Sequence, residues 1–96
     1  MKIKRIVIDV LVPNETGVLA FAEKIGELDK IDGVTIQVIE IDERTKTVEM
    51  TIEGDDVHFE KITEAIDGLG GSVHSIDEVS AGSRIIQPSK SRRGKE

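Results

Sequence analysis

The feature that most constrains what this chain can fold into is the order in which its hydrophobic periodicity changes. Apolar residues alternate over residues 3–12, then recur at helical spacing up to about Asp29. Strand-like runs return over residues 34–42 and 47–53, a second helical stripe follows, and a last strand-like run covers residues 72–80. The succession strand, helix, strand, strand, helix, strand predicts an α+β fold, the ferredoxin-like βαββαβ sandwich.

This sandwich has an antiparallel sheet whose four strands normally take the order 4-1-3-2, with both helices on one face. Alternation in the first strand places one apolar set on the helix-covered face, namely Ile6, Ile8, Val10 and Val12. The opposite face is open unless a ligand or another subunit covers it. It receives Asp9 from the first strand and Glu49 from the third. The sequence therefore predicts two acidic side chains on neighbouring central strands of an open face.

Short polar residues and glycines set the predicted boundaries between elements. Asn14 or Thr16 is expected to cap the first helix. An Asp32-Gly33 turn is expected to lead into the second strand, and residues 54–56 are expected to start the second helix.

Composition excludes several classes of site. The chain has 96 residues and no cysteine, which excludes disulfides, zinc–thiolate centres and cysteine nucleophiles. It has no apolar run of the roughly 18 residues that a membrane-spanning helix needs. We therefore expect a cytoplasmic protein with no membrane partner.

Charge is unevenly distributed along the chain. There are 13 lysines and arginines against 19 acidic residues, and residues 82–96 hold five of the basic residues but one acid. We expect one domain over residues 1–82 and a basic, mobile tail over residues 83–96. An acidic body without stacking aromatics argues against a nucleic-acid surface, apart from weak contact through the tail. The acidic body is compatible with a cation site.

The predicted cation site lies on the open face. Asp9 and Glu49 would repel each other unless a cation or a proton lies between them. Oxygen ligands of this kind suit Ca²⁺ or Mg²⁺, with Asp77 or Glu78 of the last strand completing the site. Simple alternation puts Asp77 and Glu78 on opposite faces, so the choice between them depends on the strand register. The alternative is a solvated polar face on which Arg5 neutralises an acid.

No catalytic constellation is present in the sequence. His74, Ser75 and Asp77 supply the residue types of a hydrolytic triad, but neighbours on one strand alternate between faces and cannot act together. The glycines at 68, 70 and 71 end a helix, whereas a phosphate-binding loop begins one. We therefore expect a protein that is not an enzyme.

Three stretches resemble a family of short archaeal proteins known only as a domain of unknown function: RIVIDVLVP (5–13), VIEIDERTKTVEMTIEGDD (38–56) and GGSVHSIDEVSAG (70–82). The resemblance covers residues 2–86 and implies a ferredoxin-like fold and assembly into homo-oligomers, apparently rings. It implies no activity, because none is established for the family.

A second stretch is similar to regulatory domains of the ACT type. These often carry a polar loop followed by Gly-Val-Leu at the start of the first helix, as Asn14, Glu15, Thr16 and Gly17 do here before Val18. The resemblance implies binding of an amino acid between subunits at this loop.

Together these observations predict a non-enzymatic, homo-oligomeric binding or assembly module that takes a divalent cation on its acidic sheet face. The open face is expected to carry Val7, Leu11, Ile39 and Ile41, so subunit contacts are expected there or on exposed edge strands. The alternative is an amino-acid sensor of the ACT type.

Overall fold

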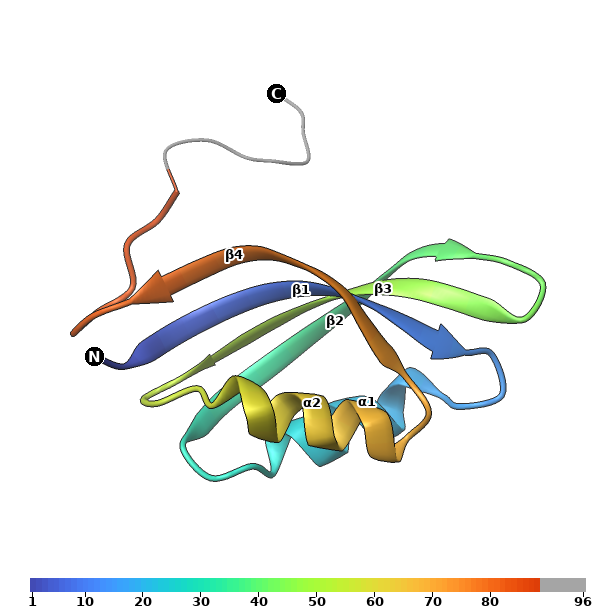
Figure 1. Ribbon diagram of the computed structural model, residues 1–96, viewed down its shortest axis with the longest axis horizontal. Coiled ribbons are helices and arrows are strands. Elements are labelled where there is room, and N and C mark those ends of the chain that lie inside the picture. Colours follow the sequence, from blue (N-terminus) through green and yellow to red (C-terminus); the bar gives the residue numbers. More distant parts are fainter. Residues whose placement is uncertain (89–96) are drawn as a thin grey trace.

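The computed structural model, which describes residues 1–88, confirms the predicted order of elements and the ferredoxin-like fold (Figure 1). The elements are β1 (Ile3–Pro13), α1 (Val18–Gly26), β2 (Ile31–Ile41), β3 (Thr45–Gly54), α2 (Phe59–Gly68) and β4 (Ser72–Ala81). The strands form one antiparallel sheet in the order β2-β3-β1-β4, which is the predicted order read from the other edge. Both helices lie on one side of the sheet.

The core lies between the sheet and the helices, as the alternation predicts. The predicted set on β1, from Ile6 to Val12, is buried together with Val48, Met50 and Ile52 of β3. From the helices come Phe21, Ile25, Ile62, Ala65 and Ile66. Burying a side chain of this size contributes about 1.5–3 kcal/mol relative to leaving it in water.

Both helices begin differently from the sequence prediction. Gly17 is the N-cap of α1 and His58 is the N-cap of α2, and neither helix has a side-chain capping bond. Asn14 instead donates from Nδ2 to the carbonyl oxygens of Asp42 and Glu43, at 2.9 and 3.2 Å. The predicted caps are therefore wrong. The side chain of Asn14, which was a candidate cap for α1, bonds the distant segment at Asp42 and Glu43 instead.

The turn between α1 and β2 also differs from the prediction. It ends at Lys30, which has a φ of 69°, and β2 begins directly at Ile31 rather than after Asp32-Gly33. The carbonyl oxygen of Lys30 accepts a hydrogen bond of 3.0 Å from the backbone N–H of Asp55. This bond links the turn to the end of β3.

β4 returns along β1 with three shifts in register. Two of the shifts leave an extra residue on β4. Asp77 is the extra residue between the pairs Val7–Glu78 and Ile8–Ile76, and His74 is the extra residue between Asp9–Ser75 and Val10–Val73. Such bulges change the direction in which nearby side chains point.

The chain beyond β4 is described as far as residue 88. The backbone N–H of Ile86 donates to Oγ of Ser80 at 3.3 Å, and no helix or strand is assigned to residues 82–88. The basic residues Lys90, Arg92, Arg93 and Lys95 of the predicted tail lie outside the described residues. Within the described part, no helix is long and apolar enough to cross a membrane.

Candidate metal centre

Asp9 and Glu49 face each other across the two central strands. The register of β1 and β3 pairs them directly, with Ile8–Met50 and Val10–Val48 as the flanking pairs. The flanking residues are all buried in the core, so Asp9 and Glu49 lie on the opposite, open face. Their predicted placement is confirmed.

Asp77 joins them because of the first bulge in β4. It is the residue between Glu78, which pairs with Val7, and Ile76, which pairs with Ile8. Regular alternation would have placed Asp77 and Glu78 on opposite faces. Because Asp77 is the extra residue of a bulge, two consecutive side chains, those of Asp77 and Glu78, point to the same face. The assumption of regular alternation in this strand is therefore wrong.

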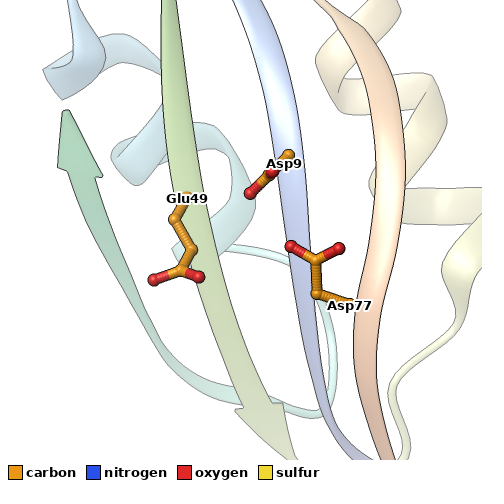
Figure 2. A group of neighbouring side chains, drawn as sticks. All are labelled: Asp9, Glu49 and Asp77. Carbon is orange, nitrogen blue, oxygen red and sulfur yellow. The ribbon is translucent and has the colours of Figure 1, made fainter. Parts of the chain in front are cut away.

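The three carboxylates form what we call the acid triad, Asp9, Glu49 and Asp77. Each contributes one oxygen to a group whose members lie within 4.8 Å of one another, and each side chain is partly buried. Figure 2 shows the three side chains coming from three adjacent strands, with Asp9 between the other two in the sheet. The hydroxyl of Ser75, which pairs with Asp9, donates to Oδ1 of Asp77 at 3.0 Å.

Glu78, the other predicted acid of β4, lies on the same face but outside the triad. Arg5 donates from Nε to Glu53 and from Nη1 to Glu78, both at 2.8 Å. These hydrogen bonds, first that with Glu53 and then that with Glu78, raise the pKa of the Arg5 guanidinium. Arg5 therefore neutralises acids on the open face, as one alternative expected, and the acids it contacts are Glu53 and Glu78.

The open face is less apolar than the sequence predicted. Val7 and Leu11 lie there as expected, but Val7 is only 7% exposed and Leu11 37%. Ile41 pairs with Lys46, which pairs with Val12 of the core, so Ile41 lies on the helix-covered side of the sheet. The prediction that Ile41 contributes to an apolar open face is therefore wrong. Exposed apolar residues gather instead on the two edge strands: Val38, Ile39 and Ile41 on β2, and Ile76 and Val79 on β4.

The other candidate residues do not converge. His74 is exposed on β4, and His58 lies on the helical side with Nε2 at 3.3 Å from Oδ2 of Asp56. Ser75 contacts Asp77, as described above, rather than a histidine. In the loop before α1, Asn14 holds the β2–β3 hairpin and Gly17 is exposed.

One sequence signal could have revealed where Asp77 points. The large apolar residues of β4 are Val73, Ile76 and Val79, and they recur every third residue rather than every second. Each interval of three contains one of the extra residues at a register shift, His74 or Asp77. A spacing of three within a strand therefore indicates a bulge here.

Comparison with known proteins agrees with the resemblance seen in the sequence. A model of the family DUF211, described as uncharacterized ArCR, matches residues 4–95. The chain is also 51% identical over 85 residues to MJ0319 of Methanocaldococcus jannaschii, described as an uncharacterized protein, and the match covers 88% of each chain. Neither description states an activity, a ligand or a partner.

Proposed function

Since the chain belongs to the DUF211 family of uncharacterized proteins, we infer its function from its own side chains, and we propose that it is a non-enzymatic module that binds a divalent cation on the open face of its sheet. The cation would be held by the acid triad. The observation that carries the proposal is the convergence of three carboxylates from three different strands.

The triad is compact enough for its three carboxylates to share one Ca²⁺ ion. Oxygens that share a Ca²⁺ ion lie about 2.3–2.6 Å from it, and so at most about 5.2 Å from each other. The triad oxygens lie within 4.8 Å of one another, which is within the limit for Ca²⁺. Three carboxylates supply three to six of the six to eight oxygens that Ca²⁺ takes, and water can complete the shell.

The proposal includes assembly of identical subunits. β2 and β4 are the two edges of the sheet, and an edge strand offers unpaired backbone groups to another chain. Both edges also carry exposed apolar side chains, including Ile39 at 48% and Ile76 at 51% exposure. Contact between such edges would bury apolar surface and leave the acid triad on one continuous face.

The direct test of cation binding is the melting temperature with and without Ca²⁺. A ligand present at 100 times its Kd adds about 2.7 kcal/mol to stability, which for a domain of this size raises Tm by roughly 10 °C or more. We expect this rise for the unchanged chain and its loss in the double variant Asp9→Asn/Glu49→Gln. Native mass spectrometry should show about one cation per subunit.

The matched control is Glu64→Gln/Asp67→Asn, which removes two exposed acids from α2, on the other side of the sheet. It should keep the full response to Ca²⁺. An equal response of the triad variant and the control would assign the effect to overall charge, and no response in the unchanged chain would exclude the site.

The second candidate is an ACT-like sensor that binds an amino acid at Asn14–Gly17. The polar loop before α1 is the feature in its favour, although the amide of Asn14 already bonds the β2–β3 hairpin. A melting screen of the twenty amino acids distinguishes the two candidates. A single amino acid that stabilises the chain, and loses its effect in Gly17→Ala, would favour the sensor, because a Cβ at Gly17 meets nothing within 4 Å and should leave the fold intact.

A further inference from the structure

A cavity of about 360 Å³ lies at one end of the helical layer, on the other side of the sheet from the acid triad. Its walls come from two segments that meet at this end of the molecule (Figure 1). One is the turn from α1 into β2, with Leu28, Asp29, Lys30 and Ile31, and the other is the start of α2, with His58, Lys61 and Ile62. The volume is in the range of pockets that bind small molecules.

The floor of the cavity is aliphatic. Leu28 and Ile31 are partly buried and pack against the core, and Ile62 is fully buried within it. The lining residues include no phenylalanine, tyrosine or tryptophan, and the one ring among them, the imidazole of His58, has its Nε2 3.3 Å from Oδ2 of Asp56. The aliphatic side chains of the floor suit the hydrocarbon part of a ligand.

The rim of the cavity is cationic, although the chain as a whole has a net charge of −6. Two lysines, Lys30 and Lys61, and one acid, Asp29, are among the lining residues. Within residues 1–88, neither lysine amino group takes part in an ion pair or hydrogen bond. The rim therefore has an excess of about one positive charge and two amino groups able to donate to an anion.

The backbone fixes Lys30 at the rim before any ligand arrives. Its φ of 69° is in the left-handed region, and its carbonyl oxygen is bonded to the N–H of Asp55. Gly54 packs so closely against this turn that a Cβ there would lie 2.1 Å from the same oxygen. A site fixed in this way loses less entropy on binding.

We propose that this cavity binds a medium-chain aliphatic monocarboxylate. The aliphatic floor takes the hydrocarbon chain, and Lys30 and Lys61 bind the carboxylate. An anion with a single charge matches the excess of one positive charge at the rim better than a phosphate ester, which carries nearly two. The proposal does not depend on the acid triad, which lies on the opposite face.

The test is an NMR titration of the full chain, labelled with ¹⁵N, with octanoate. Octanol and octylamine, which have the same chain length but a neutral or cationic head, are titrated in parallel. We expect saturable shifts of the amides of residues 28–31 and 58–62 with octanoate, and at least tenfold weaker effects with the other two probes.

The variant Lys30→Gly/Lys61→Gln removes both cationic partners. Glycine readily takes the positive φ of residue 30, so the fold should be kept. We expect the affinity for octanoate to fall by about tenfold or more. The matched control, Lys24→Gln/Arg84→Gln, removes two exposed basic residues that do not line the cavity and should bind like the unchanged chain.

The proposal is overturned if octanoate gives no saturable shift up to about 10 mM, the concentration of very weak binding. It is also overturned if octanol and octylamine bind equally well, or if the Lys30/Lys61 variant keeps its affinity. Ca²⁺ binding measured on the same variant should be unchanged, which keeps this test separate from that of the acid triad.

Discussion

At the scale of single residues, the contact between Gly54 and Lys30 shows how one glycine can fix a turn. Gly54 ends β3, and a Cβ at this position would lie 2.1 Å from the carbonyl oxygen of Lys30 and 2.8 Å from Cα of Ile31. Both neighbours are backbone atoms, which cannot move aside by a change of rotamer. Only glycine fits without moving the turn that forms one wall of the cavity.

Replacing Gly54 with alanine should therefore destabilise the protein. Forcing a methyl group into a well-packed site costs typically 1–3 kcal/mol, and contact with backbone places this substitution near about 3 kcal/mol. Urea unfolding of Gly54→Ala measures the loss. Gly33→Ala is the control, because a Cβ there meets nothing within 4 Å, and its effect should stay within about 0.5 kcal/mol. Equal stability of the two variants would contradict this account of Gly54.

At the scale of elements, the sequence predicted which strands and helices form and which face of β1 and β3 is buried. The face of Asp77 could not be predicted by alternation because β4 carries bulges opposite β1. The two helix starts could not be predicted either. Asn14 and Asp55 are residue types that often cap a helix. In the fold, Asn14 donates to the β2–β3 hairpin instead, and Asp55 accepts hydrogen bonds from Lys4 of β1 and from Lys2, which precedes β1. Tertiary contacts thus replaced local ones at the sites where the prediction failed.

Asp55 links the start of β1 to the segment between β3 and α2, and this link should depend on pH. Hydrogen bonds from Lys4 at 2.9 Å and Lys2 at 3.3 Å lower the pKa of Asp55 below its ordinary value of 3.8. Since the folded state takes up this proton less readily than the unfolded state, the stabilisation is present above pH 3.8 and is lost as the pH falls through the lowered pKa.

The pKa of Asp55 can be measured directly by following its side-chain carboxyl group in an NMR titration. We expect a value below 3.8 in the unchanged chain, rising toward 3.8 in Lys4→Met. Lys24→Met, on α1, should leave it unchanged. An Asp55 pKa that does not respond to loss of Lys4 would show that the ion pair is not formed in solution.

At the scale of the whole molecule, one layer of helices covers one face of the sheet and leaves the other face and both edges open. The open face is polar, with Arg5 and its acids at one end and the acid triad beside them. The apolar side chains that reach solvent lie mainly on β2 and β4, the edge strands. The expected homo-oligomer is therefore more consistent with contacts between edges than between open faces.

Charged substitutions on the β2 edge should break such an assembly. The variant Ile39→Lys/Ile41→Lys places two charges among exposed apolar residues, and we expect its mass in solution, measured by light scattering, to fall to that of a monomer. Leu19→Lys on α1, a position 76% exposed, should keep the mass of the unchanged chain. A monomeric unchanged chain would exclude the assembly altogether.

The acid triad also has a consequence for the order of events in folding. Asp9 comes from the first strand of the chain and Asp77 from the last, and the two approach only after β4 has paired with β1. Such a pairing of distant segments is slow to form, because a long loop must close first. A cation bound by all three carboxylates would therefore act mainly after this step. It would slow unfolding while leaving the folding rate nearly unchanged, so that its effect would be on the lifetime of the native state.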